Sequence, residues 1–138
     1  MPYPFGAAPA PHTDHRAFEA FGMRAVDHDT IDDALAAAGD DLVCVFFWGE
    51  DCYNCEMAKK AMLANPDPLR ALDLHWLHAD VYTHPALGRR FGLYGIPVFM
   101  FFHRGKKLGS ATGWHGIGQF SAAVANARLK ASGKPLTG

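Results

Sequence analysis

Cysteines are scarce in this sequence, long hydrophobic runs are absent, and neither sign of charge predominates. Three cysteines among 138 residues are too few for a disulfide framework, and one of them must stay unpaired. The longest apolar stretches, 42–48 and 96–102, are far shorter than the roughly 20 residues that a membrane-spanning helix needs. The formal net charge is −1, and lysines and arginines are scattered, so neither a nucleic acid nor a membrane is expected as a partner.

The length suits one domain with a real hydrophobic core. Because the first dozen residues are rich in proline and alanine, residues 1–22 are predicted to form a partly flexible N-terminal extension. Residues 23–138 are predicted to form a single domain. The first 18 residues lack the basic and apolar regions of a signal peptide. We therefore expect a cytoplasmic location, or a periplasmic one if a leader has been removed.

The distribution of apolar residues predicts alternating strands and helices. Runs rich in β-branched and aromatic residues predict strands at 23–27, 42–48, 74–81, 97–103 and 108–112. Helical spacing and terminal signals predict helices at 31–38, 52–64, 85–92 and 117–131, with a short helical turn at 16–21. Asp29 or Thr30 is expected to cap the helix at 31–38. The helix at 52–64 places Met57, Ala61 and Ala64 at helical spacing, and the last helix is expected to bury Phe120, Val124 and Leu129.

This order of elements predicts an α/β fold, with a central mixed sheet of four to five strands and helices on both faces. Strands separated by helices are expected to be parallel, and the last two strands to form a hairpin. In such sheets the chemistry lies at the carboxyl ends of the central strands, where helices begin. A C-x-x-C sequence, Cys52 to Cys55, lies at such a place.

Cys52 and Cys55 are three positions apart on a first helical turn, so a short disulfide can form between them. The unpaired N–H groups and the dipole of a helix N-terminus favour an anion at Cys52, and therefore its thiolate. Cys55 is one turn further in and is expected to be more buried. This division predicts that Cys52 attacks a disulfide in a partner and that Cys55 resolves the mixed disulfide.

Two segments together resemble the thioredoxin-like superfamily. "FFWGEDCYNCEMAKKAML", 46–63, is similar to its active-site segment, in which a strand ending in F-W leads into C-x-x-C on a helix. "YGIPVFMFFHRGKKLGSATGW", 94–114, is similar to its G-I-P strand, with Pro97 where the family holds a cis-proline facing the cysteines. The resemblance covers Met23 to Lys130. It implies a thioredoxin-like fold and thiol–disulfide exchange with protein substrates, without a cofactor.

The resemblance also implies a substrate-binding surface around the cysteines, formed by Trp48, Tyr53, Asn54, Ile96, Pro97 and Trp114. Because Pro97 has no N–H, the backbone before it can present Ile96 to a bound peptide. For Trp114 two interpretations stay open. It either forms part of the partner-binding surface or packs on the end of the final helix.

The sequence departs from the thioredoxin pattern at several positions. Thioredoxin carries a buried Asp on the strand before F-W, where this chain has Phe46, and the Lys that pairs with it falls near Trp76. Both members of that proton-handling pair are therefore missing. The Trp that precedes the first cysteine is Asp51 here, and the dipeptide between the cysteines is Tyr53-Asn54. The redox potential of this chain therefore cannot be taken from any one subfamily.

Asp51 has two possible roles. A carboxylate beside Cys52 repels the thiolate, which would leave less thiolate at neutral pH and push the couple toward the reducing side. Alternatively, Asp51 caps the helix and points into solvent, since Asp is a favoured N-cap residue.

The remaining cysteine and the histidines are not expected to take part. Cys44 lies in the middle of a strand and is predicted to be an inert core thiol. A zinc site at the C-x-x-C would need two more ligands, but there is no second C-x-x-C and no H-x-x-x-H. His75 and His78 have odd and even positions on one strand and so face opposite sides. No metal site is predicted.

The sequence thus predicts a monomeric thiol–disulfide oxidoreductase that exchanges disulfides with protein substrates and is recycled by an unidentified reductant. The competing hypothesis is a non-enzymatic thioredoxin-fold adaptor or assembly chaperone, whose C-x-x-C is vestigial or binds a metal. The missing buried acid keeps this alternative open.

Overall fold

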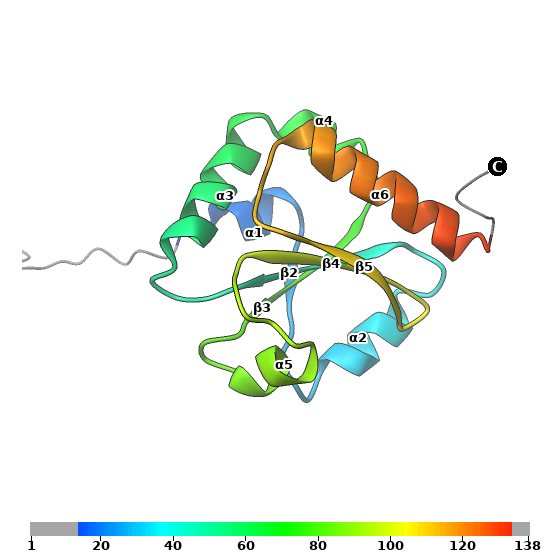
Figure 1. The fold of residues 1–138 in the computed structure, drawn as a ribbon, viewed down its shortest axis with the longest axis horizontal. Helices are drawn as coiled ribbons and strands as arrows, with labels where there is room; N and C mark the ends of the chain where they lie inside the picture. Colours follow the sequence, from blue (N-terminus) through cyan, green and yellow to red (C-terminus); the bar gives the residue numbers. More distant parts are fainter. Residues whose placement is uncertain (1–13, 134–138) are drawn as a thin grey trace, which may run out of the picture.

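The computed structural model describes residues 14–133 and contains one five-stranded sheet with the strand order β1-β3-β2-β4-β5 (Figure 1). The strands are β1 (Arg24–Ala25), β2 (Val43–Trp48), β3 (His75–Asp80), β4 (Val98–His103) and β5 (Lys106–Thr112). The helices are α1 (Arg16–Ala20), α2 (Ile31–Ala37), α3 (Tyr53–Ala64), α4 (Pro66–Arg70), α5 (Pro85–Arg90) and α6 (Ile117–Ala131). The predicted α/β fold with a mixed sheet is confirmed.

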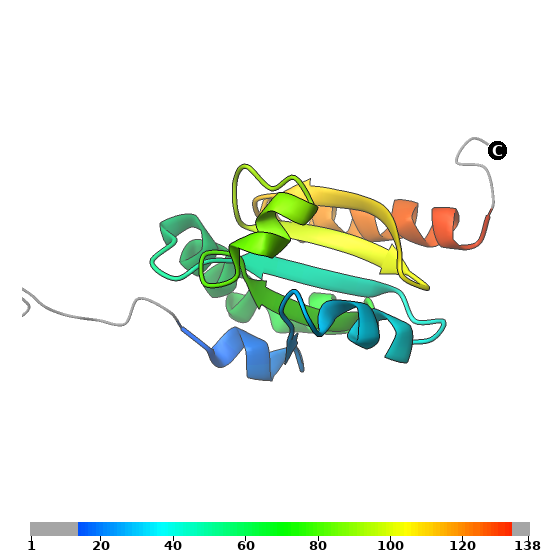
Figure 2. The same cartoon turned by 90° about the horizontal axis from the view of Figure 1, so that it is seen from below.

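Helices cover both faces of the sheet, as Figures 1 and 2 show. All six residues of β2 are buried, because this strand lies in the middle of the sheet between the two helical layers. Its alternate side chains enter two separate hydrophobic clusters. Cys44, Phe46 and Trp48 face α1, α3, α4 and α6, while the other three residues face α2 and α5. No helix within residues 14–133 is long and apolar enough to cross a membrane.

The direction of β4 differs from the expectation that strands separated by helices are parallel. β1 and β2 both run parallel to β3, but β4 runs antiparallel to β2, with Phe47 opposite Val98. The connecting helix α5 has six residues and is only about 9 Å long, whereas six strand residues span about 20 Å. The connection, residues 81–97, stays at one edge of the sheet, and β4 begins at the edge where β3 ends.

Two helix starts also differ from the prediction. Thr30 occupies the cap position of α2, but neither it nor Asp29 supplies a capping side chain. The carboxylate of Asp27 instead accepts hydrogen bonds from the N–H groups of Asp29 and Thr30, at 3.0 Å each. Helix α4 was not predicted. Pro66, which ends α3 as expected, also begins α4, because proline suits the first turn of a helix.

Helix α3 buries a different face from the one that its apolar spacing marks. Its buried residues are Cys55, Ala58, Lys59 and Met62, and not Met57, Ala61 and Ala64. A lysine on the inner face conceals the pattern, because a charged residue is not counted toward an apolar stripe. On α6, Phe120 and Val124 are buried as predicted. Leu129 is exposed and Ala127 takes the third position, since Ala127, three residues after Val124, lies on the same helical face.

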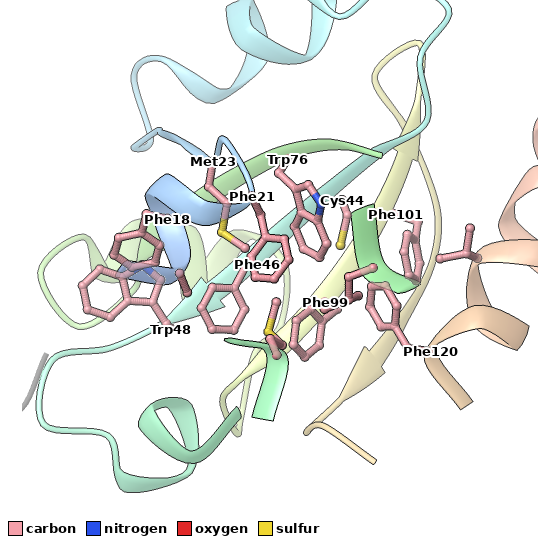
Figure 3. Close-up of a cluster of buried hydrophobic side chains, with 14 of the residues drawn as sticks. Phe18, Phe21, Met23, Cys44, Phe46, Trp48, Trp76, Phe99, Phe101 and Phe120 are labelled. Carbon is pink, nitrogen blue, oxygen red and sulfur yellow. The ribbon is translucent and has the colours of Figure 1, made fainter. Parts of the chain in front are cut away.

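The described part of the N-terminal extension, residues 14–22, packs into the core. Ala17, Phe18 and Phe21 of this segment are buried, and Figure 3 shows Phe18 and Phe21 beside aromatic residues of the sheet. The ring of Phe18 stacks on His78 at a centroid distance of 3.7 Å. The predicted flexibility of residues 1–13 lies outside the described residues.

His78 is held in its neutral form by this packing. Its Nδ1 accepts a hydrogen bond of 3.0 Å from the indole N–H of Trp48. Burial, together with the nearby His15 and Lys59, lowers the pKa of His78 from 6.5 to about 4, while Asp80 acts in the opposite direction. A protonated His78 would lose the indole hydrogen bond, because Nδ1 would then carry a proton itself.

Substituting Phe18 tests whether α1 is part of the folded core. Phe18→Ala should lower the free energy of unfolding by about 3 kcal/mol, because it leaves a cavity beside His78 and Trp48. Glu19→Ala, at an exposed position of the same helix, should change it by less than about 0.5 kcal/mol. Urea denaturation followed by tryptophan fluorescence measures both. If Phe18→Ala changed the free energy of unfolding as little as Glu19→Ala does, α1 would contribute nothing to stability.

Stability should fall as the pH decreases from about 6.5 to about 4. In this window the unfolded chain binds a proton at His78 that the folded chain does not bind, so the free energy of unfolding decreases by about 1 to 2 kcal/mol after discounting for partial exposure. His78→Gln keeps an acceptor for Trp48 but does not titrate. The variant should therefore show a flatter dependence of unfolding free energy on pH, and an unchanged slope would contradict this role of His78.

Candidate active site

Three chain segments meet at one edge of the sheet and form the candidate site. The C-x-x-C follows the end of β2, and the Ile96-Pro97 pair precedes β4. Because these strands are antiparallel, the end of one lies beside the start of the other. The segment after β5 joins them, since the N–H of Gly113 donates a 2.8 Å hydrogen bond to the carbonyl of Pro97.

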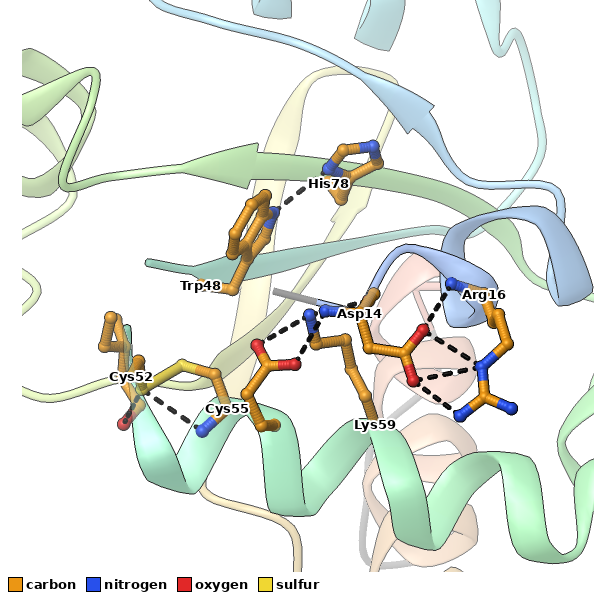
Figure 4. A network of polar contacts seen from close by, with 9 residues as sticks. Asp14, Arg16, Trp48, Cys52, Cys55, Lys59 and His78 are labelled. Atoms are coloured by element: carbon orange, nitrogen blue, oxygen red, sulfur yellow. Dashed lines mark hydrogen bonds and ion pairs between the residues drawn. A yellow bond between two sulfur atoms is a disulfide. The ribbon is translucent and has the colours of Figure 1, made fainter. Parts of the chain in front are cut away.

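The two cysteines occupy the first turn of α3 and form a disulfide, with their Cα atoms 5.2 Å apart (Figure 4). Cys52 is the N-cap residue, and its sulfur accepts a 3.1 Å hydrogen bond from the N–H of Cys55. Cys52 is 9% exposed and Cys55 is fully buried. As expected, the first cysteine is the accessible one, and it receives the field of the helix N-terminus.

A groove of about 650 Å³ lies on one side of the cysteines. Its lining includes four of the six residues expected to bind substrate, namely Asn54, Ile96, Pro97 and Trp114. The Ile96–Pro97 peptide bond is cis, and the sulfur of Cys52 lies 4.0 Å from the carbonyl oxygen of Ile96. His115 also lines this groove, and sequence reasoning assigned it no role.

Tyr53 lies away from that groove and is 74% exposed. Together with Asp51, Cys52 and Glu56 it lines a second hollow of about 570 Å³. Of the two hollows, this more acidic one is the one that Cys52 itself lines.

Trp114 packs on the final helix, as one interpretation predicted, and its part in partner binding stays a prediction. Its ring packs on Phe120 of α6 and on Phe99 of β4, with centroid distances of 5.3 and 5.8 Å. The same residue lines the groove beside Ile96 and Pro97. The final helix thus fixes the ring in place as a wall of the groove.

Trp48 does not lie on the partner-binding surface expected for it. It is only 5% exposed, because Phe18 of α1 covers it at a centroid distance of 5.2 Å. Its indole N–H is used in the hydrogen bond to His78. Trp48 instead supports the loop between β2 and α3 from beneath.

Asp51 does not cap α3, so the capping interpretation is wrong. Cys52 holds the N-cap position, and Asp51 precedes it in the left-handed region, with a φ of 61°. Its side chain is exposed, and no hydrogen bond or ion pair is recorded for it within residues 14–133. Asp51 and Cys52 line the same hollow, and the electrostatic interpretation stays a prediction.

Beneath the cysteines, Phe46 and Trp76 are both buried and form part of an aromatic core. The charge on this side of the sheet lies elsewhere. Lys59 of α3 is 1% exposed, and its Nζ lies 2.8 Å from an oxygen of Glu56. Sequence reasoning missed this pair. Lys59 is four residues after Cys55, and that spacing was the available signal for a residue on the same helical face.

Cys44 lies apart from the redox pair. It is fully buried in the middle of β2, and burial raises the pKa of its thiol well above the usual value. The structure describes no group of three or more His, Cys, Asp or Glu side chains between residues 14 and 133 that could hold a metal ion. His75 lies near Asp41 and His78 is bonded to Trp48, so the two histidines do not converge.

Residues 23–126 match the family model for thioredoxin. The chain belongs to the thioredoxin family. No curated protein sequence gives a significant match. The residues that carry the match include the C-x-x-C and the Ile96-Pro97 pair, so family and site agree. Membership together with a cysteine pair at disulfide distance suggests a thiol–disulfide oxidoreductase. Residues 14–22, with α1, lie before the matched region.

Solved thioredoxin structures share the fold of this thioredoxin-family chain. The short form of thioredoxin f from spinach chloroplast is 25% identical with a TM-score of 0.62, covering 77% of this chain and 93% of its own. Thioredoxin f2 of Chlamydomonas reinhardtii is 22% identical with a TM-score of 0.63, covering 75% and 94%. Fasciola hepatica thioredoxin is 15% identical with a TM-score of 0.65, covering 76% and 99%.

Removing the charge of Asp51 should make Cys52 more reactive. Asp51→Asn keeps the size of the side chain and tolerates the left-handed backbone, while it relieves repulsion of the thiolate. The rate of iodoacetamide alkylation at Cys52 between pH 6 and 7 should rise about threefold to tenfold.

The matched control is Asp73→Asn, which makes the same change at another left-handed aspartate, before β3 at the opposite edge of the sheet. It should leave the alkylation rate unchanged. An unchanged rate in Asp51→Asn as well would remove the electrostatic role of Asp51.

Proposed function

We propose that this thioredoxin-family protein is a thiol–disulfide oxidoreductase that acts on protein substrates, with Cys52 as the nucleophile and Cys55 as the resolving cysteine. The observation that carries the proposal is the asymmetry of the pair. The sulfur of Cys52 reaches the surface at a helix N-terminus, whereas Cys55 is fully buried one turn later. Cys52 can therefore react with a partner, and Cys55 can react with Cys52.

The chemistry uses two successive exchanges. The Cys52 thiolate attacks one sulfur of a partner disulfide, and the other partner sulfur leaves as a thiolate. A Cys55 thiolate then attacks the Cys52 sulfur of the mixed disulfide, which forms the Cys52–Cys55 disulfide and releases the second partner thiolate. A dithiol reductant reverses these steps on this protein. The two sulfur atoms carry both electrons, so the reaction needs no cofactor.

The groove supports a polypeptide as the substrate. It lies between α3 and the segment after β5, next to the Ile96 carbonyl that Cys52 approaches, and its lining includes apolar residues and two glycines. The carbonyl of Ile96 lies near the attacking sulfur and can accept a hydrogen bond from a peptide N–H. An extended segment that carries the target cysteine would fit this arrangement better than a small thiol would.

One observation favours the non-enzymatic alternative, an adaptor or assembly chaperone with a vestigial C-x-x-C. Phe46 and Trp76 fill the places where thioredoxin holds a buried acid and its lysine, so that means of moving a proton is absent. The two hypotheses differ in a single measurement, the reduction of insulin disulfides with dithiothreitol as the electron source. An adaptor would leave the rate at its uncatalysed level.

Substitutions of the three cysteines should have three different effects in this assay. Cys52→Ser should abolish the catalysed reduction of insulin, because no exposed nucleophile remains. Cys55→Ser should still attack and should accumulate as mixed disulfides, visible on non-reducing gels. Cys44→Ala is the control and should keep the wild-type rate, since that thiol is buried in the core. Trapping by Cys52→Ser but not by Cys55→Ser would reverse the two roles.

A further inference from the structure

Exposed apolar side chains gather at the edge of the sheet that holds the cysteines. Within residues 14–133 five large apolar side chains are exposed, and four of them belong to segments at this edge. These are Tyr53 and Met57 of α3, Tyr82 after β3, and Tyr94 shortly before β4. Tyrosine is enriched at protein interfaces, because it contributes a large contact area and loses little conformational freedom on binding. This edge therefore has the composition of a surface that binds another protein.

Two of these tyrosines line a hollow to which the proposed function assigns no role. Tyr82 and Tyr94, together with Arg89 of α5, line this hollow of about 250 Å³. It shares Gly95 and Ile96 with the larger groove of about 650 Å³. The hollow therefore adjoins that groove at Ile96, and a polypeptide segment that lies in the groove can continue into it.

Tyr82 is held in place although it is 61% exposed. Its ring lies directly on the main chain of Gly49, so that a Cβ atom at that position would overlap the ring. The carboxylate of Asp80 fixes the turn, since it accepts hydrogen bonds from the N–H groups of Tyr82 and Thr83 at 2.9 and 3.1 Å. A ring that is fixed before a partner arrives loses little entropy when the partner binds. Tyr82 is therefore suited to form a wall on which a partner side chain packs.

Arg89 supplies an unpaired positive charge to this hollow. Its side chain is exposed, and it forms no hydrogen bond or ion pair with another residue of the described range, 14–133. The neighbouring Arg90, by contrast, donates two hydrogen bonds to the carboxylate of Asp32, at 3.0 and 2.7 Å. The planar fork of a guanidinium matches a carboxylate, so an unpaired arginine beside a binding hollow favours an acidic group on the partner.

Charge is distributed unevenly over the hollows at this edge. The hollow that Cys52 lines has charges of both signs, from Asp51, Glu56 and Lys60. No carboxylate, lysine or arginine lines the larger groove. Of these three, only the hollow of Tyr82 has charge of a single sign. A carboxylate on the substrate is therefore attracted into that hollow in preference to the other two.

The hollow lies within a few residues of the reacting sulfur. The sulfur of Cys52 is 4.0 Å from the carbonyl oxygen of Ile96, and Ile96 lines both the groove and the hollow. Alternate side chains of an extended polypeptide are about 7 Å apart. When a substrate cysteine meets Cys52, a side chain close to it in the substrate sequence is therefore expected to enter the hollow.

We propose that the hollow formed by Tyr82, Arg89 and Tyr94 selects protein substrates with an acidic residue within about three residues of the reacting cysteine. This inference rests on the proposed function and names a substrate class for the same site. The carboxylate of the substrate pairs with the guanidinium of Arg89, and the aliphatic part of the acidic side chain packs on the ring of Tyr82. The exchange at Cys52 is itself unchanged, because the hollow acts on substrate binding.

A series of peptide substrates measures this selectivity. Each substrate is a disulfide-linked dimer of a short peptide with a central cysteine, and Glu, Gln or Lys is placed at one neighbouring position at a time, on either side. Dithiothreitol supplies the electrons, and the released peptide thiol is measured by chromatography. Each rate is corrected for the reaction with dithiothreitol alone, because a neighbouring carboxylate also changes the reactivity of its own disulfide.

The wild-type protein should prefer Glu over Gln and Gln over Lys at positions on one side of the cysteine. We expect kcat/KM to differ between the Glu and Lys peptides by about threefold to tenfold, because the ion pair is partly exposed. The difference should appear in KM, since the pair forms before the exchange. Arg89→Gln should remove the preference, and Arg89→Glu should reverse it.

The matched control is Lys106→Gln, which removes a positive charge from an exposed position at the start of β5, at the opposite edge of the sheet. It should keep the wild-type preference, and it separates a local contact with Arg89 from the net charge of the protein. A preference that is absent in the wild type, or that persists in Arg89→Gln, would overturn the inference alone. A protein that reduces no peptide above the uncatalysed rate would overturn the proposed function, and the inference would fall with it.

Tyr82→Ala tests the aromatic wall. It should raise KM for the preferred Glu peptide by about fivefold and leave kcat unchanged, because the ring contributes contact area to binding and takes no part in the exchange. Tyr82→Phe should restore the wild-type KM, since it keeps the ring. A lower kcat with an unchanged KM would mean that Tyr82 only supports the main chain at Gly49, and it would overturn the role of Tyr82 in binding.

Discussion

The antiparallel pairing of β4 with β2 is the constraint on which the site depends. It brings the start of β4, with Ile96 and Pro97, to the edge where β2 ends and α3 begins. A parallel β4 would place Pro97 at the far edge of the sheet, a strand length of about 20 Å from Cys52. The connection through α5 stays at that edge of the sheet. The places of the groove and of the Ile96–Pro97 pair beside Cys52 follow from this pairing.

The aromatic core beneath the cysteines is a second constraint on the site. Aromatic rings from α1, β2, β3, β4 and α6 fill the space under α3, and they leave room for a single ion pair, Glu56 with Lys59. The main chain of Asp14 closes this pair from outside. The ion pair lies on the same helix as the cysteines, and Lys59 is its fully buried member. The N-terminal extension, and not the sheet, holds it in place.

Much of this could be predicted from the sequence, and the failures have physical causes. The central strands were predictable because runs such as 42–48 are apolar on both faces. The cysteine pair was predictable because its spacing and its place after a strand need no tertiary information. The direction of β4 was not, because a helical signal at 85–92 does not show whether the connection crosses the sheet or stays at one edge. The burial of Lys59 was not predicted, because a lysine is expected at the surface. It is seen only in the structure, where Lys59 contacts Glu56 and Asp14.

The measurement that tests the central claim most directly is equilibration of the protein with a series of glutathione redox buffers, followed by alkylation and mass spectrometry of its peptides. A Cys52/Cys55 redox couple predicts one reversible transition in which both cysteines lose their thiols together, with the loss of two hydrogen atoms and no change at Cys44. The transition should follow the two-electron dependence on potential, in which a tenfold change in the ratio of oxidised to reduced protein takes about 30 mV. Absence of a transition, a lasting adduct of glutathione on one cysteine, or a disulfide that includes Cys44 would contradict the account.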